Sequence, residues 1–518
     1  MLFNSVEFLI FFPVVTIVFF LLPERFRRYW LLAASCFFYM SFIPYYIIIL
    51  LFTTCVDFFG ALLIGKYHDR PELKNFFFAL ALGLNIGLLV YFKYLGMLGG
   101  TFNIISSALG GATLTVPDVV LPIGISFHTF QSMGYLIDAY RANKAPERNF
   151  INFSLFLMFF PQLVAGPIER FNELSAQLKK SHRFTYENVS IGGRMMLWGM
   201  FKKVAVADNL ANISDLVFGD VASYAGWPAI IGLLCFTVQI YCDFSGYSDI
   251  ARGAAKILDI RLMENFKTPY FSTSPGEFWR RWHISLSTWF RDYIYFPMGG
   301  NRVSTPRWVL NNMVTFAVSG IWHGANWTFA FWGLLNGVLV ISGRLLRPIG
   351  DKIGKLTSGA LGYVPLPEGA KSLDKLPAET QAKIIEARGG KVWAAIRHIL
   401  ALCSTFFVIS ITWIFFRADN FRDAFKMFGN IFLADAGDFS SLPSVRLWAS
   451  AICTFLLIAI EFIFTYTPIQ SHLDKISRGE IVSSKRATAL RLFCYAAIIA
   501  VIVLFGAYDN RSFIYFQF

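Results

Sequence analysis

The sequence predicts an all-α integral membrane protein, and three properties of the chain indicate this fold class. Of its 518 residues, 56% are hydrophobic and only 15% are charged, whereas about 25% of the residues in a soluble domain are charged. The mean hydropathy is +0.53. Apolar runs close to the ~20 residues that cross a bilayer as a helix recur from one end of the chain to the other.

Each apolar run is expected to form a helix that spans or enters the membrane. Several runs are short or interrupted by glycine and proline, notably around Pro161–Pro167 and Gly320–Gly324. Broken backbone at membrane depth must be covered by protein or line a cavity, so we expect tilted or re-entrant helices there. The expected segments lie near residues 7–22, 29–42, 46–64, 76–97, 118–138, 150–166, 190–207, 227–250, 308–323, 326–345, 395–416, 446–467 and 490–507.

The charges predict how the chain is oriented in the membrane. The formal net charge is +13, but Lys and Arg form short clusters between apolar runs, which favours the positive-inside pattern over a nucleic-acid-binding face. The basic loops expected in the cytoplasm are residues 24–28, 66–74, 141–148, 346–394 and 472–489. Residues 99–117 are uncharged and residues 434–445 are acidic, so both are expected outside. This arrangement places both termini outside the cytoplasm and requires that at least one apolar segment does not cross.

Neither a disulfide framework nor a metal site is indicated. The seven cysteines lie in apolar runs and none forms a CxxC motif. Residues 7–22 have no preceding Lys or Arg and no small-residue cleavage site after them, so we interpret them as a retained membrane segment.

The physical pattern indicates that residues 241–302 carry the chemistry, because many charges interrupt the apolar pattern there. A charged residue at mid-membrane costs ~2.5–3.5 kcal/mol on insertion scales. So many polar groups therefore indicate a water-accessible cavity or interfacial helices. Its titratable residues include Asp243, Asp249, Asp259, Glu264, Arg280, Arg281, His283, Arg291 and Asp292.

Within this region, "EFWRRWHISLSTWFRDYIY" predicts one helix with an aromatic stripe. Trp279, Trp282, Leu286 and Trp289 follow the helical spacing of three and four residues. One interpretation is an interfacial amphipathic helix. The other is the wall of a pocket, with His283 facing the cavity and arginines available to an anionic acyl donor.

The stretch "SGIWHGANWTFAFWG" places His323 in an otherwise apolar frame. Histidine is suited to general-base catalysis near neutral pH. Trp322, Trp327 and Asn326 offer N–H donors or shape a slot for an acyl group, and Gly320 and Gly324 permit close approach of a chain or ligand. Taken alone, such a histidine is more often a core residue.

Together these stretches resemble the membrane-bound O-acyltransferase family, most closely its bacterial branch typified by alginate O-acetyltransferase. The resemblance is carried by "ENFKTPYFSTSPGEFWRRWHISLSTWFRDYIYFPMGGNR" and "GIWHGANWTFAFWG". "LPIGISFHTFQSMGYLIDAYR", "FFPQLVAGPIER" and "YCDFSGYSDIARG" fit the same branch, and the likeness extends from the first residue to "SFIYFQF".

The resemblance implies a ring of roughly 11–14 tilted, re-entrant and interfacial helices around a central funnel. It divides one membrane domain into N-terminal helices (1–115), an acyltransferase core (116–345), a basic cytoplasmic loop (346–394) and C-terminal helices with an aromatic tail (395–518). It implies acetyl transfer from cytoplasmic acetyl-CoA for O-acetylation of an extracytoplasmic polysaccharide, in the inner membrane of a bacterium. A periplasmic or membrane-anchored hydrolase-like partner is expected, with no tightly bound cofactor.

The resemblance also assigns roles to individual residues. His323 corresponds to the family's catalytic histidine, and His283 to a second polar site, as positioner or oxyanion donor. Tyr515 in the C-terminal "SFIYFQF" resembles a tail tyrosine proposed to carry the acyl group in D-alanylation relatives; a structural plug is the alternative. The residues expected to bind the donor or line the tunnel are Arg280, Arg281, Trp282, Trp322, Asn326, Asp243 and Ser245.

Alternative functions remain open from the sequence. Peptidoglycan O-acetylation is the alternative within the class. A proton-linked transporter and a scaffold of an export complex are alternatives of other classes, although a transporter is expected to show paired broken helices in two related halves. No such repeat is visible in the sequence.

Overall fold

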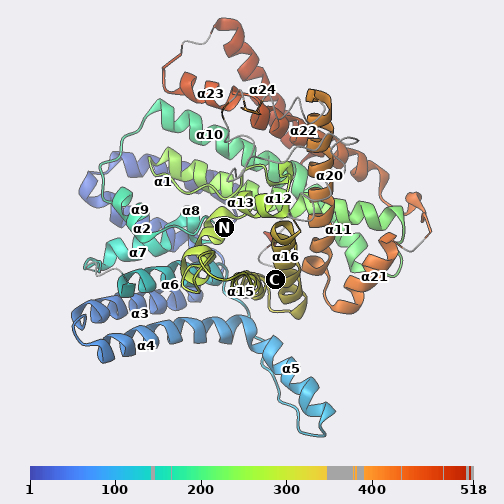
Figure 1. Cartoon of the computed structure of the whole chain (residues 1–518). Coiled ribbons are helices and arrows are strands. Elements are labelled where there is room, and N and C mark those ends of the chain that lie inside the picture. The colour runs from blue at the N-terminus through green and yellow to red at the C-terminus, as the bar shows by residue number, and fades with distance from the viewer. Residues whose placement is uncertain are drawn as a thin grey trace.

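The computed structural model is built from helices, as the composition predicts. It describes residues 1–141, 146–164, 166–346, 377, 380–381, 390–432, 435–481, 484–508 and 513–514, and these residues contain no β-strand. Most of the 346–394 loop lies outside the described residues. Figure 1 shows the helices arranged around a crowded centre, with the N-terminus near the middle of the view.

The N-terminal helices form one side of the molecule. They are α1 (Val6–Leu21), α2 (Glu24–Met40), η1 (Pro44–Tyr46), α3 (Ile47–Lys66), α4 (Pro71–Leu89), η2 (Val90–Tyr94), α5 (Leu95–Ala108) and α6 (Ile125–Arg141). The helices α3 and α4 lie side by side, and α5 projects from the body with no buried residue (Figure 1).

The middle of the chain supplies the core. Its helices are α7 (Phe150–Met158), α8 (Phe160–Leu163), α9 (Phe171–Leu178), α10 (Tyr186–Met200), η3 (Phe201–Ala207), α11 (Asp208–Gly219), α12 (Trp227–Ile257), η4 (Pro269–Phe271), α13 (Pro275–Arg281), α14 (Ile284–Phe290), η5 (Arg291–Tyr295), α15 (Thr305–His323) and α16 (Trp327–Leu345). The C-terminal helices are α20 (Gly390–Arg417), α21 (Phe421–Phe432), η7 (Phe439–Ser441), α22 (Ser444–Tyr466), α23 (Ile469–Ser477) and α24 (Lys485–Phe505).

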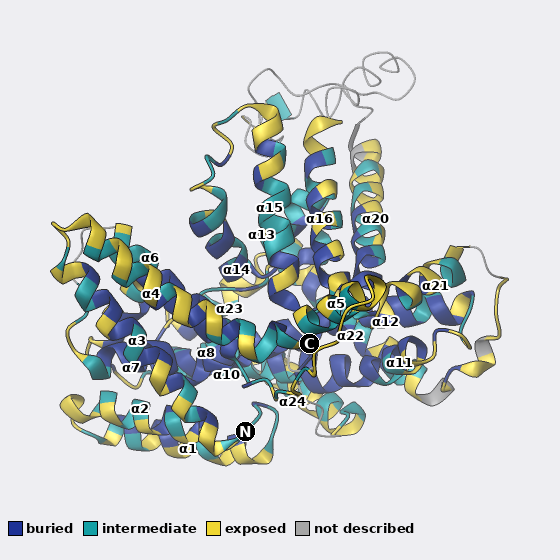
Figure 2. Cartoon of the chain, turned by 90° about the horizontal axis from the view of Figure 1, so that it is seen from below, coloured by how far each residue is buried: buried dark blue, intermediate teal, exposed yellow. Residues whose placement is uncertain are grey.

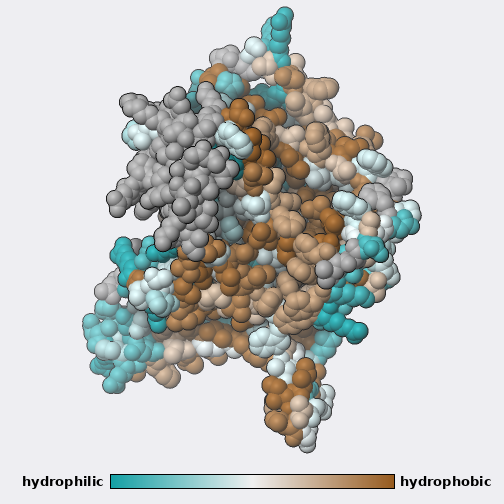
Figure 3. All heavy atoms as spheres, turned by 45° about the vertical axis from the view of Figure 1, so that its right-hand side comes forward, coloured by the Kyte–Doolittle hydropathy of each residue, from teal (hydrophilic) through white to brown (hydrophobic). Residues whose placement is uncertain are grey.

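Seven helical stretches among the described residues are long and apolar enough to cross a membrane. They are Pro44–Lys66, Pro71–Ala108, Trp227–Ile257, Trp327–Leu345, Ala395–Arg417, Arg446–Tyr466 and Lys485–Phe505. Figure 3 shows apolar side chains gathered over much of one face, as contact with lipid requires. The remaining expected segments form shorter or more polar helices. The chain is therefore a multi-pass membrane protein in which many helices serve the interior.

The helix α12 is the centre of the core. It is 31 residues long, and 78% of its most apolar 18-residue stretch is buried. Figure 2 shows it in the dark blue of buried residues. It packs on α10 through glycines seven residues apart. A Cβ at Gly199 would lie 2.5 Å from the Gly246 carbonyl oxygen, and one at Gly253 would lie 2.5 Å from the Gly192 carbonyl oxygen. Small residues allow helix backbones in membranes to approach this closely.

Candidate active site

The expected single helix around His283 is wrong, because the chain breaks at that residue. Helix α13 ends at Arg281 and α14 begins at Ile284, with His283 between them at φ +45°. Asn265 holds the break: its carbonyl oxygen accepts the Ile284 N–H at 2.9 Å, and its side-chain oxygen accepts the Ser285 hydroxyl at 2.6 Å. A non-glycine residue in the left-handed region is strained, and such strain concentrates at functional sites.

His323 is the last residue of α15, and its tautomer follows from its hydrogen bond. Its Nδ1 lies 2.6 Å from the Ser319 carbonyl oxygen, four residues back in the same helix. A carbonyl only accepts, so Nδ1 carries the proton of the neutral ring. This leaves Nε2 as the proton acceptor, which is the state that a general base requires.

The structure brings His283 and His323 together. Their ring centroids are 6.4 Å apart and the ring planes are inclined at 67°. Both side chains are buried, with exposed fractions of 1% and 2%. Neither ring nitrogen of His283 has a hydrogen-bond partner among the described residues. An unpaired buried imidazole is costly, which fits a ring that bonds to a substrate.

Aromatic side chains surround the two histidines. The Phe244 ring centroid is 4.6 Å from that of His283, and the Trp322 ring centroid is 4.9 Å from that of His323. The Trp332 ring also meets His323 at 5.0 Å. This apolar wall keeps bulk water and ions away from the pair.

A narrow cavity of about 40 Å³ opens beside His323. Its side-chain walls include Lys93, Ser126, Phe127, Trp322 and His323. A water molecule needs roughly 10–15 Å³ measured in this way. The cavity therefore has room for a hydroxyl group or a few waters, whereas a bulky acyl donor requires the walls to move.

Lys93 is a site residue that the sequence reasoning missed. It lies in η2, and its Nζ donates to the carbonyl oxygens of Trp322 at 2.7 Å and His323 at 3.1 Å. Carbonyls in the last turn of a helix have no intrahelical partner, so Lys93 caps α15 at His323. The available signal was a single cation inside the apolar run 76–97, since intramembrane cations generally mark function.

Two predicted donor-binding arginines lie at the end of α13 rather than beside the histidine cavity. Arg280 is exposed, and Arg281 forms an ion pair with Glu277 at 2.6 Å. Burial alone would raise the pKa of Glu277, but hydrogen bonds from Thr273 and the nearby arginines bring it below its usual value. Glu277 is therefore ionised at neutral pH and holds Arg281 in place. The neighbouring Trp282 is fully buried and stacks on Phe278.

The frame around His323 depends on close contact between α15 and α16. A Cβ at Gly320 would lie 2.3 Å from the Phe329 carbonyl oxygen, and one at Gly324 would lie 2.2 Å from the Phe329 ring. The close approach expected at both glycines is thus made by α16 itself. Asn326 caps α16 by accepting the Thr328 N–H at 3.1 Å, and its amide donates to the Asp419 carbonyl oxygen at 2.6 Å.

Asp243 and Ser245 lie on α12 and do not line the cavity beside His323. Asp243 forms an ion pair with Lys203 at 2.7 Å, and its other oxygen accepts the Ile514 N–H at 2.8 Å. Ser245 is buried, with no hydrogen-bond partner for its hydroxyl among the described residues. Asp243 therefore anchors the C-terminal tail.

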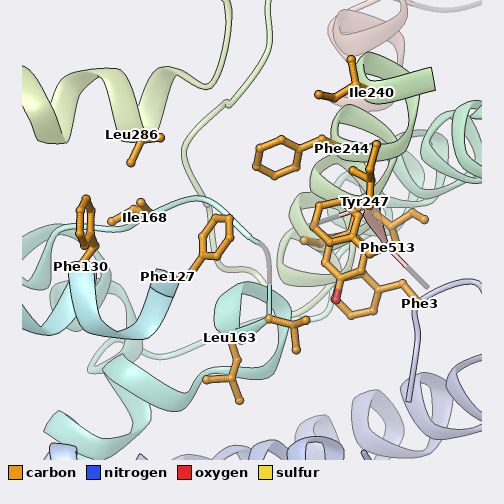
Figure 4. Packing of buried hydrophobic residues seen from close by; sticks show 14 of the residues in the cluster. Phe3, Phe127, Phe130, Leu163, Ile168, Ile240, Phe244, Tyr247, Leu286 and Phe513 are labelled. Carbon is orange, nitrogen blue, oxygen red and sulfur yellow. The ribbon is translucent and has the colours of Figure 1, made fainter. Parts of the chain in front are cut away.

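The tail enters the core next to the histidines. Phe513 and Ile514 are 1% and 2% exposed. The Phe513 ring contacts Tyr247 at 4.9 Å and Phe244 at 5.5 Å, and Figure 4 shows Phe513 beside Tyr247 and Phe3. Phe244 thus touches both the tail and His283. Tyr515 itself lies outside the described residues.

Comparison with known proteins gives a consistent result. Residues 136–364 match the model of the membrane-bound O-acyltransferase family. The chain is 33% identical to a protein of Azotobacter vinelandii named "Probable alginate O-acetylase AlgI", over the full length of both chains. It is 34% identical to the protein of that name from Pseudomonas aeruginosa, over 90% of this chain and 81% of the relative.

A further relative has a different printed activity. The "Peptidoglycan O-acetyltransferase" of Helicobacter pylori is 33% identical over 72% of this chain and 67% of its own length. The family match and the sequence identities and coverage of these relatives agree with the helical membrane fold and the buried histidine pair described above. The chain belongs to the membrane-bound O-acyltransferase family and is an O-acetyltransferase of the membrane.

Proposed function

We propose that this enzyme moves acetyl groups from acetyl-CoA on the cytoplasmic side of the bacterial inner membrane to an extracytoplasmic polysaccharide such as alginate. The observation that supports this best is the buried pair of His283 and His323, whose ring centroids are 6.4 Å apart, with a cavity beside His323 that has room for a hydroxyl group. The alginate assignment is supported by full-length relatives with that printed activity.

In this mechanism, His323 Nε2 accepts the proton of the acceptor hydroxyl as its oxygen attacks the thioester carbonyl. The new C–O bond forms, the C–S bond breaks, and the proton passes from His323 to the departing thiolate. His283 donates an N–H to the oxyanion that develops on the carbonyl, and such donors contribute greatly to acyl transfer. Lys93 keeps the end of α15 in position, and Arg280 and Arg281 contact donor phosphates.

We assign Tyr515 as an intermediate carrier of the acetyl group, because it directly follows the buried tail residues Phe513 and Ile514 in the sequence. Ile514, the preceding residue, is fixed to Asp243, and Phe513 touches Phe244 beside His283. An acetyl ester on Tyr515 is then passed to a hydrolase-like periplasmic partner that acetylates the polymer. Both termini lie outside the cytoplasm in this arrangement.

The decisive experiment for the activity uses His323→Ala. General-base catalysis contributes ~10²–10⁴-fold, so ester content of the secreted polymer should fall to background while the membrane level of the protein is unchanged. His398→Ala is the matched control, because His398 lies on the exposed surface of α20. Normal polymer ester content in the His323 variant would contradict the assignment.

The carrier role is tested by Tyr515→Phe, which removes only a hydroxyl. We expect loss of polymer acetylation with normal protein level, and loss of an acetyl-labelled enzyme in the presence of labelled acetyl-CoA. Tyr508→Phe is the control, because the Tyr508 hydroxyl is exposed and bonds only to the Ile502 carbonyl oxygen among the described residues. Wild-type acetylation in Tyr515→Phe would make the tail a structural plug.

Peptidoglycan is the second candidate acceptor, because the Helicobacter pylori relative has that printed activity at the same level of identity. The two acceptors are separated by measuring esters on purified exopolysaccharide and on purified cell wall from the same cells. Esters confined to the cell wall would replace the polysaccharide assignment.

A further inference from the structure

A second hollow lies at the junction of α1, α2 and the segment after α9, and it shares no lining residue with the cavity beside His323. Its volume is about 210 Å³, roughly five times that of the cavity beside His323. Five of its lining side chains are cationic and one is a carboxylate, that of Glu24. The cationic residues are Arg25, Arg27, Arg28, Lys179 and Lys180.

Most of this charge is not compensated by nearby carboxylates. Lys179 forms an ion pair with Glu147. Among the described residues, no carboxylate oxygen lies within 4.0 Å of a side-chain nitrogen of Arg25, Arg27, Arg28 or Lys180. Glu24 accepts the Ser181 hydroxyl instead. The pocket therefore has a strong net positive charge.

Two of the arginines are fixed by neutral groups. Arg27 donates to the carbonyl oxygens of His182 at 2.7 Å and Leu22 at 3.0 Å, which ties the start of α2 to the segment after α9. Arg28 donates to the side-chain oxygen of Asn152 at 2.6 Å. These contacts set the shape of the pocket and leave each guanidinium with its full charge. Arginines arranged in this way are well suited to bind phosphate.

His182 adds no charge to the pocket. Burial lowers the pKa of His182 below its usual value, although Asp259 acts in the opposite direction. The ring is therefore largely neutral at physiological pH, and the positive charge comes from the arginines and lysines alone.

The other walls of the pocket are apolar, and the adjacent helix surface faces lipid. Phe19, Leu31 and Leu178 line the hollow beneath the cations. On α1, Val14, Ile17 and Leu21 are 51%, 59% and 78% exposed, at positions that share one helix face. A ligand with both an anionic head and an apolar chain matches these two surfaces.

We propose that this pocket binds the phosphate headgroup of an anionic phospholipid, whose acyl chain lies along α1. Clusters of basic residues where helices end at the cytoplasmic surface are a recognised environment for anionic lipid heads. The pocket lies where α1 ends and α2 begins, next to the basic residues 24–28 that the charge pattern predicts to be cytoplasmic. A free phosphate or a soluble phosphate ester shares the head chemistry but leaves the apolar walls unused.

The test compares lipids that differ only in headgroup charge. The purified full-length chain in neutral detergent is titrated with phosphatidylglycerol, with phosphatidylcholine of the same acyl chains, and with inorganic phosphate. Thermal stability and lipid retained in native mass spectrometry are measured. We expect phosphatidylglycerol to stabilise and to be retained, and the two other ligands to do neither. Equal effects of phosphatidylcholine, or full stabilisation by inorganic phosphate alone, would overturn the proposal.

A charge-matched pair of variants locates the site. Arg25 and Lys180 are both exposed at the pocket and make no ion pair among the described residues, so Arg25→Gln with Lys180→Gln should fold normally. We expect about tenfold or greater loss of phosphatidylglycerol affinity. Lys66→Gln with Arg70→Gln removes the same charge from another exposed basic loop and should retain the affinity. Equal loss in both variants would show general charge attraction and would overturn the pocket assignment.

Discussion

The cavity beside His323 and the pocket at α1 and α2 differ in the charge that their walls present. The cavity beside His323 is lined by Phe127 and Trp322, and its cation, Lys93, donates to backbone carbonyls. The pocket at α1 and α2 gathers several cations with few carboxylates. The first keeps an imidazole neutral and able to accept a proton, whereas the second attracts an anion. The same chain thus separates proton transfer from electrostatic binding by where it places apolar walls.

Among the variants that test this comparison, substitution of His283 is expected to change the rate of acetyl transfer most. Removing one oxyanion donor typically costs about 10²–10³ in rate, so His283→Ala should lower acetylation by about 10²-fold. His283→Asn keeps an N–H donor and should retain more activity. Rates of acetyl transfer by equal amounts of each variant in membranes measure both. If the two variants are equally inactive, a ring in the left-handed backbone position is itself required, and the donor role fails.

A smaller effect is expected from Lys93, which positions the end of α15 without providing the base. Lys93→Met keeps most of the length of the side chain and removes both bonds to the carbonyls of Trp322 and His323. We expect about a tenfold loss, or about 1.4 kcal/mol of transition-state stabilisation. Lys93→Arg should restore part of the rate, because a cationic donor remains.

The control for Lys93 is Lys74→Met on the neighbouring helix, where Nζ lies 4.6 Å from the centroid of the Tyr140 ring. That variant should transfer acetyl groups at the normal rate. A normal rate in Lys93→Met as well would show that the capping contacts do not affect catalysis.

The smallest expected effect is a loss of stability at the contact between α15 and α16, next to the cavity beside His323. Gly320→Ala places a methyl group 2.3 Å from the Phe329 carbonyl oxygen, and overpacking of this kind costs about 1–3 kcal/mol. We expect a lower melting temperature in detergent. Gly343→Ala is the control, because a Cβ there meets no atom within 4 Å. Equal melting temperatures for the two variants would show that α15 and α16 can move apart freely.

The sequence allowed the helical membrane fold and the close approach at Gly320 to be predicted, since hydropathy and glycine spacing are local signals. The two histidines that it singled out, His283 and His323, lie close together in the structure. It did not allow the break at His283 to be seen, because Asn265, which holds the break, precedes it by 18 positions and the aromatic stripe continues through it. The hydrogen bond that holds the C-terminal tail joins Ile514 to Asp243, which are 271 positions apart in the sequence. Lys93 was visible as an intramembrane cation, but its partners on α15 were not.

The burial of Phe513 beside Phe3 and Tyr247 has a consequence for how the protein is made. These rings come from opposite ends of the chain, and the contact of Phe3 with Tyr247 measures 4.4 Å between centroids. Domains generally begin to fold from the N-terminus during synthesis. Here Phe513 follows its contact Tyr247 by 266 positions, so this part of the core stays incomplete until the C-terminal helices between them have been synthesised. Until then the Tyr247 face of α12 lacks the ring that covers it.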